Sequence, residues 1–456
     1  MIDDVLGRFA THGLDLLARE DPALHACLVR EYHRQLATLT MVAASSVADP
    51  SVLVCEGLAT TNVTTEGYPG ARFHAGCAVV DEIERLAIER AKAAFGARYA
   101  NVQPHSGTSA NEAVLLGLLR PGDTILGLEL AAGGHLTHGA RASVSGQYFN
   151  AVGYGVTPEG VIDYDQVARL AREHRPKLII CGASAYPRAI DFARFRAIAD
   201  EVGAFVLADI SHIAGLVAAG AHPSPIDHAH FTTTSTYKQL YGPRGGLILI
   251  GRDWDRPAPG GKETLAELVQ RAVFPLSQGT PNLSAIAAKA RALALVRTPE
   301  FRALAHRIVA DARALAAALA DRGFRVLTGG TDNHIVLVDV AARGVSGAVA
   351  ERSLEECRII VNRNRIPGDR SSVWVTSGMR LGTNTVAHRG MGPEEMTHCA
   401  DLIARVLTGV RVLGDRDYAL DPDLRAAVRR DVAKLCAAFP IPRYPVPVGG
   451  GEEWVG

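Results

Sequence analysis

The sequence lacks the features typical of membrane, secreted and nucleic-acid-binding proteins. It has no run of about 18 apolar residues, so we expect no helix that spans a membrane. Lys+Arg and Asp+Glu both total 48, so no basic surplus favours nucleic acid and no charge block favours an anionic membrane. The N-terminal residues are charged throughout and lack the apolar core of a signal peptide. These absences predict a cytoplasmic location.

Cysteine is also sparse, and its spacing is irregular. Seven cysteines are scattered along 456 residues, and none forms a CxxC pair. This pattern argues against a disulfide framework or a zinc site and suits buried thiols in a reducing compartment. Internal repeats and long low-complexity tracts are missing, and no Walker motif indicates a nucleotide phosphate.

Short apolar runs alternate with helical segments through the middle of the chain. Four runs rich in Ile, Leu and Val predict strands at 123–130, 177–184, 204–211 and 245–251. Their near-continuous apolarity is typical of a sheet buried on both faces. The helical segments between them imply a mainly parallel α/β sheet.

Helical periodicity is clear in two segments. Residues 80–96 form a predicted helix that stops at Gly96, and its apolar face comprises Ile83, Leu86, Ala87, Ala91 and Ala94. Residues 299–324 form a longer predicted helix, with apolar residues at 301, 304, 305, 308, 309, 312, 315, 316 and 319.

Changes in the predicted order of helices and strands divide the chain into three parts. Residues 1–50 form an N-terminal helix and an irregular arm, and residues 51–297 form a large α/β domain. Residues 298–456 form a smaller α+β domain, in which strands at 333–340 and 357–362 flank a second helix. This domain ends in an irregular Pro- and Gly-rich tail.

One lysine, Lys238, closes a second predicted strand, the hydroxyl-rich run 232–238, just before a glycine-rich turn. Asp209 ends the apolar strand that precedes this run. Ligands of open α/β sheets bind at the carboxyl ends of strands. A lysine that bonds to the cofactor and an acid that faces a pyridinium nitrogen are what pyridoxal phosphate needs. The pair therefore favours this cofactor, and a buried Asp–Lys ion pair is the alternative.

Three further patterns could contribute to a site. Residues 106–108, Ser-Gly-Thr, precede a predicted helix whose N-terminus could hold a phosphate, although an ordinary helix cap is the alternative. His135 and His138 have a spacing that could serve a metal, but without a cysteine or acid nearby we expect none. Arg380 could bind a substrate carboxylate or simply lie at the surface.

Seven stretches together resemble the serine hydroxymethyltransferase family, in that family's order and spacing over about residues 40–410. They are GYPGARFHAGC, YANVQPHSGTSAN, GGHLTHGA, ADISHIAGLVAAGAHP, TTTSTYKQLYGPRGGLIL, GGTDNHIVLVD and TSGMRLGT. The resemblance implies a type I pyridoxal-phosphate fold with a mainly parallel seven-stranded sheet. It also implies tetrahydrofolate as co-substrate, a small amino acid as substrate, and a homodimer whose subunits share active sites.

The resemblance assigns cofactor residues position by position. Lys238 would bond to the cofactor, Asp209 would face the ring nitrogen, and His135 would stack on the ring. Ser184 and His212 would lie near the phenolic oxygen. The phosphate would be held by Ser106, Gly107 and Thr108, together with Gly279 from the second subunit.

The resemblance also assigns substrate and folate residues. Arg380 would take the substrate carboxylate, and Glu66 would move a proton between the folate carbon and the substrate hydroxyl. Ser235 stands where the family has a threonine near the lysine. The positions that match the folate site are Leu130, Leu136, Phe274 and Asn364.

Several positions depart from the family pattern. Thr64 and His74 replace two tyrosines that crowd the amino-acid end of the site, and Tyr237 replaces a histidine. A normally glycine-rich loop reads LSQGT at 276–280, and Ala-Ser replaces Ser-Glu at 44–45. The catalytic set is intact, so these changes indicate altered substrate choice.

Room beside Cα predicts activity on α-methylserine and D-alanine, the substrates of one branch of the family, and otherwise on serine and glycine. A folate-independent threonine-type aldolase or transaldolase is the first alternative, because the altered loop could spoil folate binding. A non-catalytic pyridoxal-phosphate-binding protein is the second.

Overall fold

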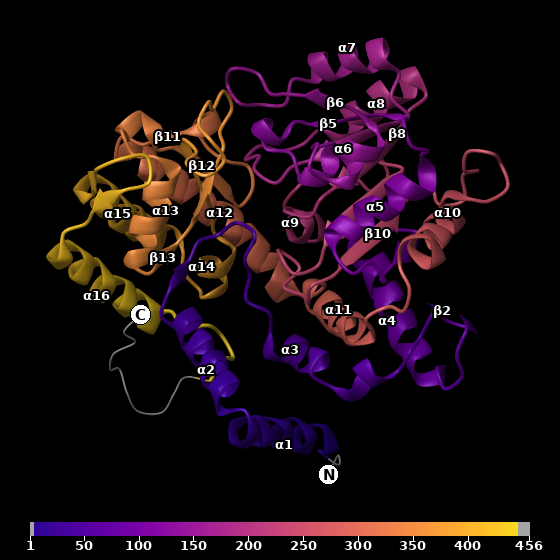
Figure 1. Ribbon diagram of the computed structural model, residues 1–456, viewed down its shortest axis with the longest axis horizontal. Helices are drawn as coiled ribbons and strands as arrows, with labels where there is room; N and C mark the ends of the chain where they lie inside the picture. The colour runs from indigo at the N-terminus through magenta and orange to yellow at the C-terminus, as the bar shows by residue number, and fades with distance from the viewer. Residues whose placement is uncertain (1–3, 446–456) are drawn as a thin grey trace.

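A seven-stranded sheet organises the larger part of the computed structural model, which describes residues 4–445 (Figure 1). In spatial order its strands are β4 (Tyr99–Asn101), β10 (Gly246–Ile250), β9 (Phe231–Ser235), β8 (Phe205–Asp209), β7 (Leu178–Gly182), β5 (Thr124–Leu128) and β6 (Asn150–Tyr154). Among these strands only β10 runs antiparallel to its neighbours. The predicted mainly parallel seven-stranded sheet is confirmed.

Helices cover both faces of this sheet. Successive strand residues face opposite sides, so Ile179 and Val206 pack in one core while Ile180 and Leu207 pack in another. The helices of the first core are α4 (Ala78–Phe95), α7 (Tyr164–His174), α8 (Phe192–Val202) and α11 (Leu283–Val296), and those of the second are α5 (Gly107–Leu118) and α10 (Leu265–Arg271). The continuous apolarity of the strands follows from burial on both faces.

Helix α4 differs in one respect from its predicted apolar face. It ends at Gly96, whose φ of 69° lies in the left-handed region, and Ala87 and Ala91 are fully buried as predicted. Leu86, however, is 45% exposed. Two acidic residues of the helix, Asp81 and Glu84, are buried instead. Apolar periodicity missed them because an arginine neutralises them from another segment.

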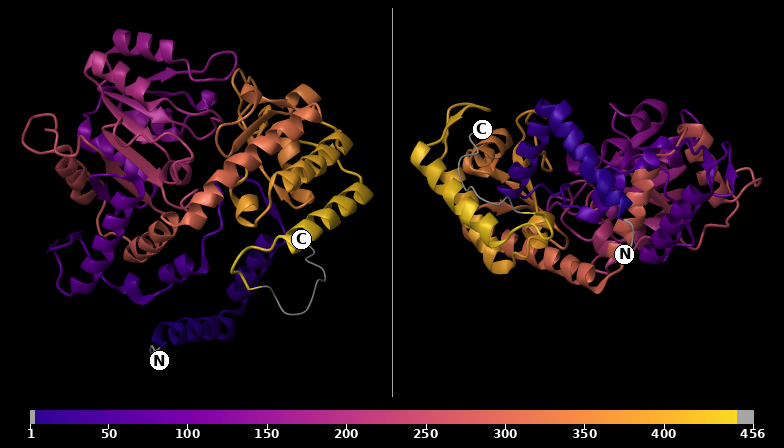
Figure 2. Two further views of the ribbon diagram at one scale, coloured as in Figure 1. Left: turned by 180° about the vertical axis from the view of Figure 1, so that it is seen from behind. Right: turned by 90° about the horizontal axis from the view of Figure 1, so that it is seen from below.

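A second core surrounds a four-stranded antiparallel sheet, which lies beside the first in Figure 1 and in the rear view of Figure 2. Its strands are β11 (Arg325–Val326), β12 (Ile335–Asp339), β15 (Gly378–Gly382) and β14 (Asn362–Asn364), and its helices are α12 (Pro299–Asp321), α13 (Gly347–Glu356), α15 (Pro393–Gly409) and α16 (Pro422–Ala438). The long helix expected over 299–324 is confirmed as α12. The domain boundaries at 50/51 and 297/298 remain predictions.

The N-terminal segment forms two helices where one was expected. Asp21 ends α1 (Val5–Glu20) and caps α2 (Pro22–Leu36), whose first residue is a proline that cannot continue the preceding helix. Neither helix has a buried residue, and α1 lies at the lower edge of the molecule in Figure 1 and in the left view of Figure 2. Beyond them β1 (Leu39–Thr40) pairs in parallel with β13 (Ile359–Ile360).

The described residues contain further short elements. These are α3 (Pro50–Glu56), β2 (Gly67–Tyr68), β3 (Ala71–Arg72), α6 (Val144–Tyr148), α9 (Ala214–Ala218), α14 (Asn384–His388), β16 (Arg411–Val412), β17 (Tyr418–Ala419) and the single turns η1 (Ala59–Asn62), η2 (Leu130–Ala132), η3 (Leu136–His138), η4 (Ala272–Ser277), η5 (Leu327–Gly329) and η6 (Ala341–Arg343). No helix within residues 4–445 has the length and apolarity to cross a bilayer. Of the predicted irregular tail, 446–456 lies outside the described residues, and 439–445 holds no helix or strand.

A buried carboxyl group in α12 makes stability depend on pH. Asp311 is fully buried, and neither of its carboxylate oxygens has a hydrogen-bond partner among the described residues. Burial raises the pKa of Asp311 to about 7, an effect that Arg307 opposes and Glu395 reinforces. Because its pKa is higher in the folded state, the protein loses stability between the unfolded pKa of about 4 and pH 7.

We therefore expect Asp311→Asn to raise the free energy of unfolding at pH 8 by about 2–4 kcal/mol, with little gain at pH 4. Urea unfolding at both pH values measures this difference. Asp321→Asn, a change at the exposed end of the same helix, is the matched control. Equal gains at the two pH values would contradict a buried ionisable Asp311.

Candidate active site

The loops that follow five strands bring the predicted cofactor residues to one edge of the large sheet. Strands β4, β5, β7, β8 and β9 all point the same way, so their carboxyl ends share this edge. The residues that follow or end them are Ser106, His135, Ser184, Asp209 and Lys238. β9 ends at Ser235, so Lys238 lies in the loop beyond the strand and does not close it as the sequence had suggested.

Asp209 sits at the centre of a hydrogen-bond network. Its Oδ2 accepts hydrogen bonds from Asn111 Nδ2 at 2.8 Å and His138 Nε2 at 3.1 Å, and its Oδ1 accepts one from the Ser211 N–H at 3.0 Å. Burial raises the pKa of Asp209, but the hydrogen bond from His138 and the charges of His138 and His135 outweigh it. The pKa therefore lies well below its ordinary value, and the carboxylate stays charged.

Sequence reasoning missed the contribution of His138 and Asn111. Both lie in motifs that we singled out, GGHLTHGA and SGTSAN, but their contact with Asp209 joins distant parts of the chain. The premise that no acid lies near the two histidines is wrong, since ligand atoms of His135, His138 and Asp209 lie within 4.8 Å of one another. In this cluster His138 and Asn111 already bond the same carboxylate oxygen.

Lys238 is a buried amine, only 7% exposed. Burial lowers its pKa to about 8, although the charge of Asp209 opposes this shift; Arg380 and Arg244 add to the lowering. The lysine is thus partly neutral near physiological pH, as a nucleophilic amine must be. The Tyr237 ring lies 5.8 Å from Lys238 Nζ and 3.7 Å from the Arg244 guanidinium carbon.

The predicted phosphate loop begins α5. Ser106 caps the helix, because its Oγ accepts a hydrogen bond from the Ser109 N–H at 3.0 Å. A Cβ on Gly107 would lie 3.2 Å from both Ser211 Oγ and the backbone nitrogen of Ser235, so a glycine lets the loop pack closely against β9. Thr108 is exposed in the first helical turn. The loop combines a helix N-terminus with hydroxyl groups, which suits an anion.

Arg380 reaches the same edge from β15. Its Nη1 donates to the Ser184 carbonyl at 2.5 Å, and its Nε donates to Asn362 Oδ1 at 3.0 Å. His212 stacks on His334 with ring centroids 6.0 Å apart. Burial, and then the charges of Lys238 and Arg380, hold the pKa of His212 well below its ordinary value, so its imidazole is neutral. We call Lys238, Asp209, His135, Ser184, His212 and Arg380 the lysine cluster.

A second group of predicted residues gathers around the β2–β3 hairpin. Glu66 Oε2 lies 3.3 Å from His74 Nε2, and a Cβ on Gly279 would lie 3.6 Å from Glu66 Oε1. Phe73 and Phe274 meet edge to face with centroids 5.6 Å apart. We call these five residues the hairpin cluster. Within residues 4–445 no hydrogen bond, ion pair or ring contact joins it to the lysine cluster.

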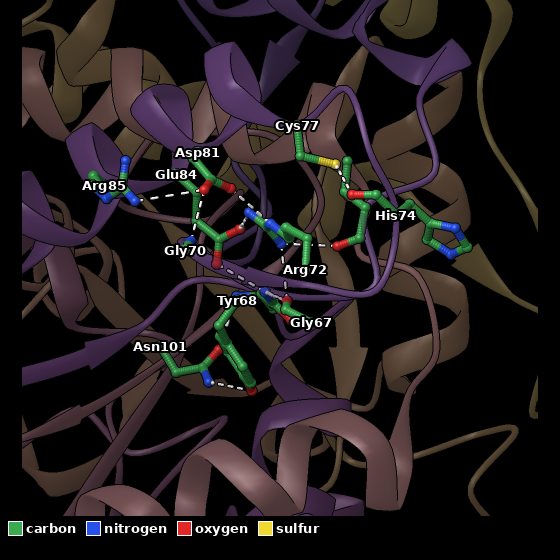
Figure 3. Close-up of polar contacts among 12 residues, drawn as sticks. Gly67, Tyr68, Gly70, Arg72, His74, Cys77, Asp81, Glu84, Arg85 and Asn101 are labelled. Carbon is green, nitrogen blue, oxygen red and sulfur yellow. Dashed lines mark hydrogen bonds and ion pairs between the residues drawn. The ribbon is translucent and has the colours of Figure 1, made fainter.

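Buried ion pairs anchor the hairpin to helix α4 (Figure 3). Arg72 pairs with Asp81 at 2.8 Å and with Glu84 at 2.6 Å, and its Nη1 donates to the carbonyl oxygens of Thr65 and Gly67. In Figure 3 the labelled His74 ring points away from these ion pairs. Sequence pattern does not indicate this anchor, apart from the two acids on an otherwise apolar helical face. Thr64 is exposed at the start of the same loop.

The predicted folate positions lie in three places. Leu130 and Leu136 are 44% and 47% exposed on the turns η2 and η3, which flank His135. Asn364 ends β14 and is half-buried, and Phe274 belongs to the hairpin cluster. Exposed leucines beside a polar site offer an apolar face to a flat ligand.

The N-terminal arm passes between the two sheets beside this site. Ser46 Oγ donates to the Tyr237 carbonyl at 2.5 Å, next to Lys238. Met41 accepts a hydrogen bond from the Gly382 N–H at 2.8 Å, two residues after Arg380. The arm therefore ties the lysine-bearing loop to strand β15.

Comparison with known proteins shows that the chain is similar to serine hydroxymethyltransferases over most of its length. The serine hydroxymethyltransferase family model matches residues 17–403. The chain is 50% identical to a serine hydroxymethyltransferase of Acidiphilium cryptum (strain JF-5) over 428 residues, which cover 94% of this chain and 96% of the relative. It is 48% identical over 421 residues to that of Xanthomonas campestris pv. campestris (strain B100), with 92% and 97% covered. It is also 48% identical over 443 residues to that of Erythrobacter litoralis (strain HTCC2594), with 97% and 98% covered.

Proposed function

The chain belongs to the serine hydroxymethyltransferase family, and from this premise we propose that it prefers α-methylserine and D-alanine to serine and glycine. The enzyme is a pyridoxal-phosphate-dependent hydroxymethyltransferase of the type I fold, with tetrahydrofolate as co-substrate. The preference rests on Thr64 and His74, which stand where the resemblance to the family implies two tyrosines, and His74 lies beside Glu66.

The residues of the lysine cluster fit pyridoxal phosphate. His212 Nδ1 is buried and has no partner among the described residues, so it can bond a ligand atom. Asp209 is held charged, as it must be to keep a pyridinium nitrogen protonated. Lys238 would attach the cofactor, and residues 106–108 would hold its phosphate. When bound, pyridoxal phosphate supplies an electron sink for charge at Cα.

The remaining residues bind the substrate and move its proton. The Arg380 guanidinium would hold the substrate carboxylate through its two-pronged geometry. His135 would stack on the cofactor ring from the turn between Gly134 and Leu136. Glu66 would take the proton from the substrate hydroxyl and return it on the reverse path. Ser235, buried at the end of β9, would pack beneath Lys238.

Substrate choice depends on the space beside Cα. Thr64 is much smaller than tyrosine, so its position leaves room for a methyl group. His74 keeps a hydrogen-bonding side chain, but its ring is shorter than that of tyrosine, and it contacts Glu66 at 3.3 Å. A methyl group in an apolar pocket contributes about 1–3 kcal/mol, so the preference is a matter of degree and the substrates overlap.

We expect kcat/KM for α-methylserine or D-alanine to exceed that for serine or glycine by about tenfold or more. Thr64→Tyr with His74→Tyr should swing the preference back toward serine, because the two rings refill the space beside Cα. Initial rates measure it, with tetrahydrofolate as co-substrate for serine and α-methylserine and with methylenetetrahydrofolate, which carries the one-carbon unit, for glycine and D-alanine. The matched control is Thr397→Tyr with His398→Tyr, a neighbouring pair exposed on α15.

Two outcomes would count against this reading. If the unmodified enzyme already prefers serine to α-methylserine, the pocket argument is wrong and the enzyme is a serine/glycine transferase. If α-methylserine or threonine is cleaved equally fast without tetrahydrofolate, the chain works as a folate-independent aldolase. The altered loop at 276–280, with Leu276 51% exposed, is the feature that would favour that outcome.

We also propose a homodimer in which the hairpin cluster of one subunit completes the lysine cluster of the other. The support is the separation of the two clusters within one chain. Mixing Lys238→Ala with Glu66→Gln chains should then restore about a quarter of wild-type activity, because each mixed dimer regains one intact site. An active monomer in sedimentation, or no recovery on mixing, would refute shared sites.

A cytoplasmic location completes the proposal. All seven cysteines are free, and five of them are buried. Buried thiols without partners suit a reducing compartment. Activity recovered in the soluble fraction of the source cells, and retained in reducing buffer, would support this location.

A further inference from the structure

Lys289 is a buried cation without an acidic partner. It lies on α11, is 2% exposed and carries a side chain that apolar residues surround on the same helix. Its Nζ donates to three backbone carbonyl oxygens, those of Val102 at 2.7 Å, Pro104 at 3.0 Å and Gly246 at 3.0 Å. These three bonds use every proton of the ammonium group.

The three carbonyls belong to the segments that carry the proposed cofactor residues. Pro104 lies just before the phosphate loop, and its carbonyl also accepts the Gly246 N–H at 2.9 Å. A Cβ on Gly246 would overlap the carbonyl of Ser106, so the two segments touch. Gly245 in turn accepts the Thr236 N–H at 3.0 Å, two residues before Lys238. Lys289 therefore joins the phosphate loop to the lysine-bearing loop.

The geometry is that of a cation held by carbonyl oxygens. Backbone carbonyl groups that converge on one point are ligands for monovalent cations. Burial lowers the pKa of Lys289 to about 7, and the charge of Glu84 opposes this shift. Three carbonyl acceptors need three N–H donors, which only the protonated amine supplies, so these hydrogen bonds favour the ammonium form. A side chain that served packing alone could be methionine, which has nearly the same length and no such cost of burial.

We propose that the Lys289 ammonium acts as a built-in monovalent cation that holds the two cofactor-binding loops together, which makes Lys289 a positioning residue for cofactor retention. The inference rests on the proposed placement of the cofactor. A cavity of about 320 Å³ adjoins the site and gives a small ion access to it. Its lining includes Gln103, Pro104, His105, Asn282 and Lys289.

The test uses two variants that both remove the ammonium group, one that fills the space it occupied and one that leaves that space empty. Lys289→Met fills the space without charge, whereas Lys289→Ala leaves room for a free ion. Both holoenzymes should lose pyridoxal phosphate at least about tenfold more readily on dilution, since hydrogen bonds to a charged group are lost. Potassium or ammonium chloride should restore most of the retention of Lys289→Ala but not that of Lys289→Met. Choline chloride, whose cation is too large, and Lys434→Ala, which removes an exposed lysine, are the controls.

The apo protein gives a second readout. Potassium or ammonium should raise the melting temperature of apo Lys289→Ala more than choline does, and should leave the wild type unchanged. Wild-type cofactor retention in both variants would overturn the proposal. So would a loss that no small cation reverses, because Lys289 would then only fill space. If the wild type itself bound no cofactor, the proposed function would be wrong. The melting temperatures of the apo proteins would still show whether a small cation can replace the Lys289 ammonium.

Discussion

Lys238→Ala is expected to abolish the covalent attachment of pyridoxal phosphate and to lower kcat by about 10³-fold or more. The physical reason is that Lys238 is a buried amine whose pKa is lowered to about 8 and whose charge interacts with that of Asp209. Borohydride reduction fixes the cofactor to whichever lysine carries it, and peptide mass spectrometry then identifies that lysine.

Lys238→Arg is the informative companion, since it keeps the positive charge beside Asp209 but cannot bond to the cofactor in the same way. It should lose attachment as completely as the alanine variant. A cofactor trapped on another lysine, such as the buried Lys289, would refute the assignment. Retained attachment in Lys238→Ala would do the same.

Glu66→Gln is expected to cut tetrahydrofolate-dependent turnover by about 10²-fold or more while amino-acid binding stays nearly intact. Glutamine keeps the shape of the side chain and its contact with His74, which lies 3.3 Å away, but it cannot take up a proton. Steady-state rates with tetrahydrofolate, set beside amino-acid affinity measured without it, separate the two effects.

Glu82→Gln supplies the control, because Glu82 is an exposed acid on α4 outside the hairpin cluster. Its turnover should match that of the wild type. Unchanged turnover in Glu66→Gln would leave Glu66 with a purely structural contribution. A parallel fall in amino-acid affinity would place it in substrate binding instead of proton transfer.

The spacing of apolar residues predicted the helices and strands, because the burial of each element determines which of its positions are apolar. Strand β8, which ends at Asp209, is an apolar run, and strand β9, which precedes Lys238, is a hydroxyl-rich run; all their residues except Phe205 are buried. The helix α12 keeps its apolar stripe because one face packs on the second core. The resemblance added which residues would share a site; the structure places Gly279 beside Glu66 and Phe274 beside Phe73, while the functions assigned to them remain predictions.

The sequence pattern could not predict contacts between distant segments in which a buried acidic side chain is neutralised by a partner from another segment. Leu86 is exposed and Glu84 is buried because Arg72, outside the helix, neutralises the acid. The contact of His138 with Asp209 was missed for a similar reason, since it joins loops after two separate strands. Neither apolar periodicity nor motif spacing carries information about partners that lie so far away in the chain.

The pairing of β1 with β13 has a consequence for how the chain reaches its native state. Leu39 pairs with Ile359, so this contact closes about 70% of the chain into one loop. During synthesis β1 cannot pair until the ribosome has released β13, although Tyr237, the partner of Ser46, emerges earlier. Residues at the start of the chain thus gain their strand partner only after most of the protein has been made.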